Sequence, residues 1–137
     1  MDFSECSKRA VQTALAMGPD SNVMLLHGFE VLQDGLMNYA GVSSDLISSY
    51  QAEAQENSIE EMRRFIAALG LGGRLLSSSV QLGYAPFVIQ EYAEKFVPDL
   101  IVMGKHGKNS VEDILLGSVT RYTINETSCD ILVTPLP

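Results

Sequence analysis

The chain has 137 residues, with 9 basic and 17 acidic side chains, a formal net charge of −8 and 46% hydrophobic residues. This length fits a single domain over residues 1–137, and the hydrophobic share is enough for an ordinary core. A net negative charge repels phosphate backbones and anionic lipids at long range, so we expect neither a nucleic-acid-binding nor a membrane-binding protein. A phosphate-bearing ligand would have to be held by a local arrangement of residues.

The sequence shows no membrane-helix, secretion-signal or paired-cysteine pattern. No apolar run approaches the roughly 20 residues of a membrane helix, and the first four residues have neither the basic nor the apolar part of a secretion signal. We therefore expect a cytoplasmic protein. Cys6 and Cys129 lie far apart without a CxxC spacing, so two plain thiols and no metal site are expected.

The first half of the chain predicts a helix, a strand and a longer helix. Apolar residues at helical spacing predict a helix over residues 4–17 with a serine cap near its start. The nearly continuous apolar stretch 22–29 is typical of a strand buried on both faces of a parallel sheet. An irregular connection is expected over 31–44, and 45–69 predicts a helix with a charged outer face.

The second half continues the alternation. The half-polar stretch 74–81 predicts a strand at a sheet edge, and a helix over 87–96 follows a proline. Residues 100–103 form a short apolar strand pattern, a helix is expected from about Ser118, and 130–134 supplies a last strand.

Strands alternating with helices predict an α/β fold with a parallel sheet covered by helices on both faces, which is a doubly wound sheet. The pattern opens on a helix and contains four strands. We expect these to be the second to fifth strands of a five-stranded design whose first member would precede Asp2 and is missing from the chain.

The most informative motif follows the strand at 100–103. It reads Gly104, two residues, Gly107, nine residues, then Gly117-Ser118, and both of its ends lie where a parallel sheet presents ligands. Gly104 and Gly107 are expected to let the backbone approach an anion and adopt dihedrals closed to other residues. Amides at the start of the last helix, with the hydroxyls of Ser118 and Thr120, would bind phosphate oxygens.

The same loop contains Lys105 and Lys108, two of the four lysines in an acidic chain. A local phosphate cradle is one interpretation, and an ordinary surface loop with turn glycines, a serine cap and solvated lysines is the other. A Walker loop is excluded by the Gly107-Lys108-Asn109 sequence, and no GxGxxG follows any strand.

Taken together, these segments resemble the universal stress protein family. The G-x2-G-x9-G-[ST] spacing, in its strand contexts, is similar to the nucleotide-binding signature of that family, and the resemblance covers essentially the whole chain. The segments that carry it are Asp2-Phe3-Ser4 with Ser7, Leu25-Leu26-His27, Asp99 to Gly104, Leu116 to Thr120, and Cys129 to Val133.

The resemblance implies a flavodoxin-like sheet, similar to that of the adenine nucleotide alpha hydrolases, with the missing first strand at its centre. It also implies binding of ATP, or of ADP or AMP, with or without Mg²⁺, by a homodimer paired through the last strand. By matching position, Asp2 would bind the ribose or adenine and Gly28 would border the base. Gly28 stands where the family often has Val after the strand-ending His. The residues implied around ribose and phosphates are Met103, Gly104, Gly107, Gly117, Ser118, Val119 and Thr120.

The leading hypothesis is therefore an ATP-binding stress-response regulator in which the nucleotide switches conformation or partner choice. The alternative is an adenine-nucleotide-processing enzyme with weak ATPase or adenylyl-transfer activity. No residue is placed by sequence to activate water, so no catalytic residue is assigned. His27 is expected to be a hydrogen-bonded core histidine and His106 a solvated loop histidine.

Two other functions of this topology do not fit. A signalling receiver needs a phosphorylatable Asp at the end of the middle strand and a lysine near the last strand, but Gln81-Leu82 offers no Asp and Thr134-Pro135 offers no lysine. A flavin carrier would place its glycine loop after the first strand, which is not where these glycines lie.

Overall fold

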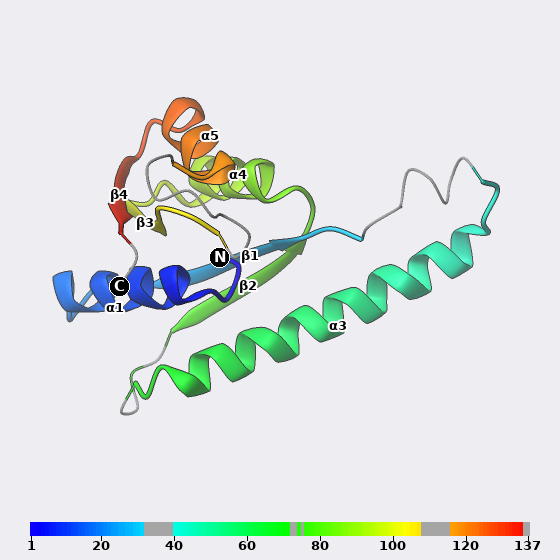
Figure 1. The fold of residues 1–137 in the computed structure, drawn as a ribbon, viewed down its shortest axis with the longest axis horizontal. Coiled ribbons are helices and arrows are strands. Elements are labelled where there is room, and N and C mark those ends of the chain that lie inside the picture. Colours follow the sequence, from blue (N-terminus) through cyan, green and yellow to red (C-terminus); the bar gives the residue numbers. More distant parts are fainter. Residues whose placement is uncertain (32–39, 72–73, 75, 108–115, 136–137) are drawn as a thin grey trace.

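The computed structural model describes residues 1–31, 40–71, 74, 76–107 and 116–135. Helices and strands alternate along the chain, which confirms the predicted α/β fold (Figure 1). The described elements are α1 (Glu5–Met17), β1 (Met24–Phe29), α3 (Ser44–Ala68), β2 (Ser77–Leu82), α4 (Ala85–Phe96), β3 (Leu100–Gly104), α5 (Ser118–Glu126) and β4 (Asp130–Thr134). Residues 32–39 of the expected irregular connection lie outside the described residues.

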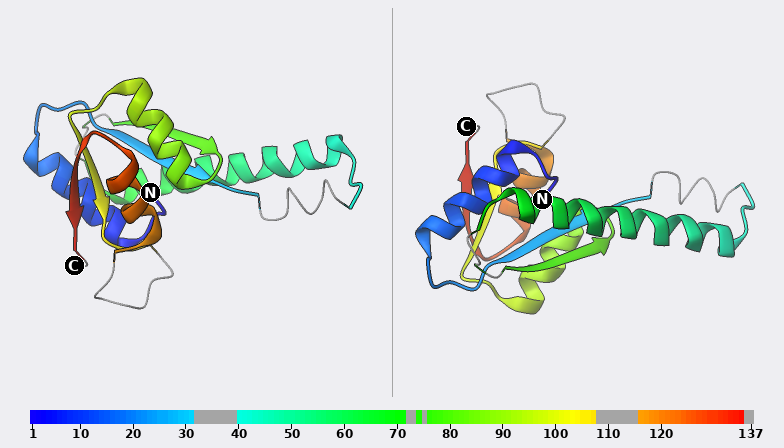
Figure 2. Two further views of the ribbon diagram at one scale, coloured as in Figure 1. Left: turned by 90° about the horizontal axis from the view of Figure 1, so that it is seen from above. Right: turned by 90° about the horizontal axis from the view of Figure 1, so that it is seen from below.

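The four described strands form two parallel pairs. β1 pairs with β2 in the register Leu25 to Ser78, and β3 pairs with β4 in the register Ile101 to Ile131. In the described part of the chain these pairs are two separate two-stranded sheets, with no hydrogen-bonded strand joining β1 to β3. Helices α1 and α3 lie on one side of the strands and α4 and α5 on the other, as Figures 1 and 2 show. This is the layering of a doubly wound fold.

The first residues of the chain attach to β1. The Met1 amine donates to the Leu26 carbonyl oxygen at 2.5 Å, and His27 Nδ1 donates to the Met1 carbonyl oxygen at 2.7 Å. The Phe3 ring packs on His27 with 4.5 Å between centroids and on Phe65 of α3 with 5.7 Å. These contacts confirm that His27 is hydrogen-bonded, although it is half-buried and not fully in the core, and they fix the entry of the chain into α1.

The core lies where α1, β1 and α3 meet. Val11, Leu25 and Met62 are buried and form one cluster, with exposed fractions of 5%, 3% and 2%. Val11 and Met62 come from the inward faces of α1 and α3, whose apolar positions recur at helical spacing, and Leu25 comes from β1. Helix α1 also packs against β3 and β4, so it contacts both strand pairs.

Several boundaries differ from the sequence prediction by one to three residues, among them the starts of β2 and α4. The strand expected to start at residue 74 begins at Ser77, because the Arg74 guanidinium donates to the carbonyl oxygens of Leu15 (3.1 Å) and Gly18 (2.7 Å). Arg74 thereby satisfies carbonyl groups at the C-terminus of α1. Helix α4 begins at Ala85, two residues before the predicted start, with its proline still in the first turn.

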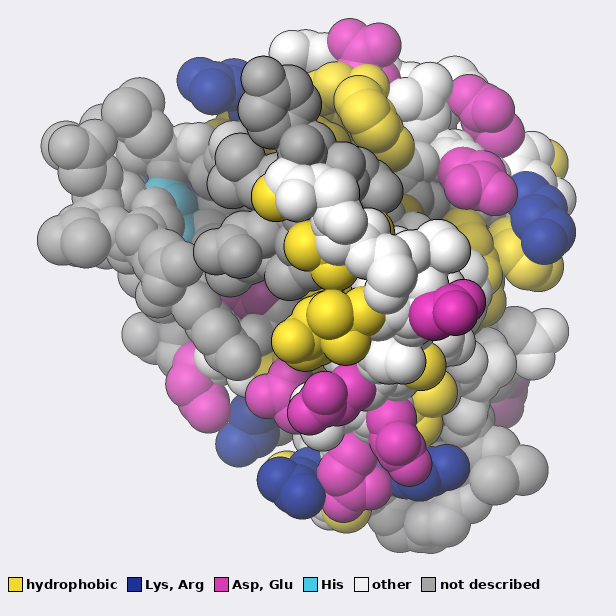
Figure 3. Space-filling view, turned by 90° about the vertical axis from the view of Figure 1, so that its right-hand side faces the viewer, with side chains coloured by type: hydrophobic (Ala, Val, Ile, Leu, Met, Phe, Trp, Pro, Cys, Tyr) yellow, Lys and Arg dark blue, Asp and Glu magenta, His cyan; other side chains and the backbone are white. Residues whose placement is uncertain are grey.

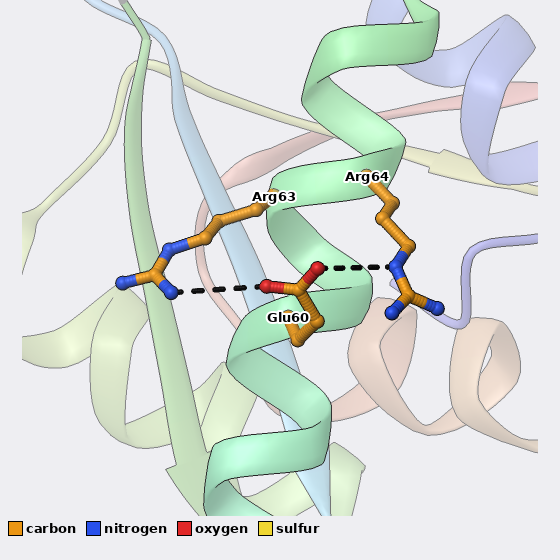
Figure 4. Close-up of polar contacts among 3 residues, drawn as sticks. All are labelled: Glu60, Arg63 and Arg64. Carbon is orange, nitrogen blue, oxygen red and sulfur yellow. Dashed lines mark hydrogen bonds and ion pairs between the residues drawn. The ribbon is translucent and has the colours of Figure 1, made fainter.

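The outer face of α3 is charged, as predicted. Glu60 pairs with Arg63 at 3.8 Å and with Arg64 at 3.1 Å, which are i,i+3 and i,i+4 spacings (Figure 4). These groups are about half or more exposed, so each pair contributes only about 0.3–0.5 kcal/mol. The first turns of α3 extend past the strands (Figure 2). Within the described residues no helix is long and apolar enough to cross a membrane.

Met62 should dominate the packing of α3. Replacing Met62 with Ala removes a side chain that is 2% exposed and should lower the free energy of unfolding by about 2–5 kcal/mol. The neighbouring Arg63→Ala, at an exposed side chain, is the matched control and should change it by less than about 0.5 kcal/mol. Urea denaturation followed by circular dichroism measures both, and equal losses would contradict this assignment of the core.

Candidate functional site

The candidate site lies where β3 ends. Lys105 N donates to the Thr134 carbonyl oxygen at 2.8 Å, which extends the β3–β4 pairing by one bond, and the chain then enters the glycine loop. Gly117, at the other end of the loop, donates its N–H to the Lys105 carbonyl oxygen at 2.9 Å. The two ends of the glycine motif are therefore side by side, at the carboxyl edge where α/β folds bind ligands.

Gly104 is required by the close approach of α1. A Cβ at Gly104 would lie 2.7 Å from Cys6 Cβ and 3.2 Å from the Cys6 backbone carbon. The predicted special dihedrals are wrong for Gly104 and Gly107, because the described glycines with positive φ are Gly41, Gly70 and Gly83. At Gly104, crowding against the Cys6 backbone, and not backbone conformation, selects glycine.

Gly107 lies against Asp2. A Cβ at Gly107 would lie 2.8 Å from Asp2 Oδ2, and its other near neighbour is the carboxyl carbon of the same residue. The structure therefore brings together two site residues that are separated by most of the chain. Asp2 carries a carboxylate, and Gly107 leaves its backbone exposed beside that carboxylate.

The Asp2 carboxylate is held by the first turn of α1. Its Oδ1 accepts from Ser4 N (3.1 Å), Ser4 Oγ (2.6 Å) and Ser7 Oγ (2.8 Å). Phe3 between them has a φ of 59°, which is rare for a bulky side chain and turns the chain back over α1. A strained residue of this kind persists only where its surroundings hold it, and such residues cluster at functional sites.

Helix α5 begins without a side-chain cap. Its N-cap is Gly117, and no side-chain hydrogen bond at this cap is found among the described residues, whereas serines cap α1 and α3. Ser118 is exposed at this end and Val119 is partly exposed. Uncapped amides at a helix N-terminus are suited to an anion.

Thr120 has a different role from the predicted one. Its side chain is buried, and its Oγ1 donates to the Gly104 carbonyl oxygen at 2.9 Å. Thr120 thus fastens the first turn of α5 to the end of β3. Its hydroxyl proton is engaged in that bond and is not presented to a ligand.

Gly28 allows another close contact, at the end of β1. A Cβ there would lie 3.0 Å from Ala85 Cα and 3.3 Å from the Gly83 carbonyl oxygen. The absence of a side chain at Gly28 lets the start of α4 approach β1. Its predicted place beside a base stays a prediction.

The remaining loop residues are partly buried. Met103 and Lys105 are half-buried, and Lys108 lies outside the described residues. The prediction that His106 is solvated is wrong, since it is 6% exposed. Its neighbours in sequence are accessible, but the loop folds its ring inward.

Sequence reasoning missed the partners of the site residues. Ser4 and Ser7 were expected only as helix caps, and Cys6 only as a plain thiol. The Asp-x-Ser-x-x-Ser spacing at the start of α1 is a signal that could have identified the carboxylate network, since Asp and Ser side chains near a helix start bind one another and the backbone.

The described charged side chains around the end of β1 do not form a surface of one sign. Figure 3 shows acidic and basic side chains interspersed over the face at which β1 ends, with no broad basic area among the described residues. Burial lowers the pKa of the Met1 amine, and the nearby Asp2 carboxylate opposes that shift. Away from the site, burial raises the pKa of the Cys129 thiol. No group of three or more potential metal ligands occurs among the described residues.

The alternating fold, the paired ends of the glycine motif and the uncapped helix define a doubly wound α/β protein with its candidate site at the carboxyl edge of the strands. The sequence model of the Universal stress protein family matches residues 1–135. The chain therefore belongs to the universal stress protein family.

Individual relatives agree with this assignment. Universal stress protein Sll1388 of Synechocystis is 26% identical, over 97% of this chain and 92% of its own. MJ0577 of Methanocaldococcus jannaschii is also 26% identical, and its solved structure superposes with a TM-score of 0.72, covering 98% of this chain and 91% of that one. A universal stress protein solved in complex with cAMP shares the fold at 19% identity, with a TM-score of 0.58 over 100% of this chain and 93% of that one.

The two loop glycines should respond differently to substitution. Gly104→Ala forces a Cβ against the Cys6 backbone, which cannot move without shifting α1, and should lower the free energy of unfolding by about 1–3 kcal/mol. Gly107→Ala meets no backbone atom but only the Asp2 carboxylate, and displacing that group weakens its hydrogen bonds to Ser4 and Ser7, so the loss should be smaller, at most about 1 kcal/mol. Chemical denaturation of both variants is the measurement. A stable Gly104→Ala protein would show that the contact with α1 is not needed.

Proposed function

We propose that this universal stress protein is a regulator that binds ATP at the junction of Asp2, the Gly104–Gly107 loop and the start of α5. The observation that carries the proposal is the position of Asp2 Oδ2, 2.8 Å from where a Cβ on Gly107 would lie, next to an uncapped helix N-terminus. A carboxylate accepts hydrogen bonds from sugar hydroxyls, and helix amides donate to phosphates. An acceptor for the sugar hydroxyls and donors for the phosphates therefore lie at the same edge of the strands.

In this arrangement each predicted residue has a separate task. The amides of Ser118 and Val119 would bind phosphate oxygens, and Gly107 would admit the nucleotide close to the loop backbone. Asp2 would accept a hydrogen bond from the ribose, and Gly28 and Met103 would border the base and sugar. Gly104, Gly117 and Thr120 would keep the loop and helix in place.

The nucleotide class is supported by the family and by the relative solved with cAMP. ADP and AMP present the same ribose and base and are expected to bind more weakly, because they offer fewer phosphate oxygens. Mg²⁺ would be carried by the phosphates of the nucleotide. No acidic cluster in the described residues suggests a second source of metal ligands.

A regulatory role follows from where the nucleotide would lie. Asp2 is linked through the first residues to β1, whereas the glycine loop and α5 belong to the β3–β4 pair. A ligand that contacts both would favour one arrangement of the two strand pairs over others, and a ligand shifts conformation only through such differential contacts. That is the basis for a switch in conformation or partner choice.

Replacing Asp2 with Ala should weaken ATP binding by about tenfold to a hundredfold, since a hydrogen bond to a charged group is lost. The matched control is Asp20→Ala, at an exposed acidic residue in the turn after α1. Isothermal titration calorimetry with ATP and Mg²⁺ measures both. Absence of ATP binding by folded wild-type protein would overturn the proposal. Steady release of ADP and phosphate, or of AMP or pyrophosphate, on incubation with ATP would favour the enzymatic alternative.

We also propose a homodimer paired through β4. Strand β4 pairs with β3 on one side. Among the described residues no strand pairs with its other edge, and a second copy of the chain would pair there. Unpaired strand edges are sites of association. Sedimentation equilibrium should therefore give twice the monomer mass, and a monomer at every concentration tested would contradict this pairing.

A further inference from the structure

We propose that Ser4 and Ser7 are positioning residues that aim the Asp2 carboxylate at a ribose hydroxyl and thereby make the site selective for ribonucleotides. The proposal rests on the function proposed above and adds to it a determinant of specificity.

These bonds form a closed ring. Asp2 N donates to Ser7 Oγ at 3.2 Å, and Ser7 Oγ donates to Asp2 Oδ1 at 2.8 Å. Ser7 N donates to Ser4 Oγ at 3.2 Å, and Ser4 Oγ donates to Asp2 Oδ1 at 2.6 Å. Each hydroxyl both accepts from a backbone N–H and donates to the carboxylate, so neither can rotate without losing a bond.

The ring fixes one carboxylate oxygen and therefore the direction of the other. With Oδ1 held by three donors, the plane of the carboxyl group is set, and Oδ2 points at Gly107. Ser7 is 8% exposed, so its part of the ring is shielded from water. Hydrogen bonds in such surroundings are stronger and leave less rotational freedom to be lost when a ligand binds.

A carboxylate held in a fixed orientation can distinguish ribonucleotides from deoxyribonucleotides by the sugar hydroxyl that deoxyribonucleotides lack. A ribose hydroxyl that donates to Asp2 Oδ2 gains a charge-assisted bond, whereas a deoxyribose leaves the carboxylate without that donor. Sites built to bind a hydroxyl reject analogues that lack it more strongly than apolar sites reject a size difference. A carboxylate free to rotate would lose this advantage, because binding the ribose would cost it side-chain conformational entropy.

The experiment compares ATP, 2′-deoxy-ATP and 3′-deoxy-ATP by calorimetry. Wild-type protein should bind ATP at least about tenfold more tightly than one of the two deoxy analogues. Ser7→Ala should weaken ATP binding by about tenfold and bring that ratio close to one. Ser7→Thr keeps the hydroxyl and should restore the ratio, and Ser58→Ala, which removes a hydroxyl from a residue that is also 8% exposed, should leave it unchanged.

A purely structural role of Ser7 would alter stability without changing the ratio, so the ratio is the decisive readout. Ser4→Ala provides an independent variant if Ser7→Ala does not fold, and it should also reduce the ratio. Two results would overturn this inference alone: wild-type protein that binds ATP and both deoxy analogues with equal affinity, or an unchanged affinity ratio in the folded serine variants. Failure of wild-type protein to bind any of them would overturn the proposed function together with it.

Discussion

The first turn of α1 lies directly against the end of β3, and the site depends on that contact. Cys6 approaches Gly104 so closely that a Cβ on the glycine would be 2.7 Å from the cysteine side chain. The same turn holds Asp2 through Ser4 and Ser7, so packing α1 on β3 also delivers the carboxylate to Gly107. A single close approach therefore organises both the packing and the chemistry of this edge.

That contact also explains how two separate strand pairs form one site. Helix α1 packs on β3 and β4, while Val11 on the same helix joins Leu25 and Met62 in the core beside β1. In the segment before the helix, the Met1 amine is hydrogen-bonded to Leu26 and the Phe3 ring packs on His27 at a tilt. Movement of one strand pair relative to the other would therefore displace the segment that carries Asp2, which couples the site to the arrangement of the fold.

Much of the fold could be predicted because its signals are local. Apolar stretches and helical spacing gave all the described strands and helices, and the glycine spacing located the loop beside α5. The start of β2 could not be predicted, since Arg74 leaves the strand pattern to bind α1, a contact across 56 residues to Gly18. Thr120 and His106 were misjudged for the same reason: their partners and burial come from the folding of the loop, which residue type alone does not specify.

The central claim is that a nucleotide lies between Asp2 and the start of α5 and is contacted by both. Amide hydrogen exchange with and without ATP tests it most directly, because protection is measured segment by segment. The account predicts slower exchange in three places at once: residues 2–7, residues 104–107 and the first turn of α5. Protection confined to other segments, in protein saturated with ATP, would contradict it.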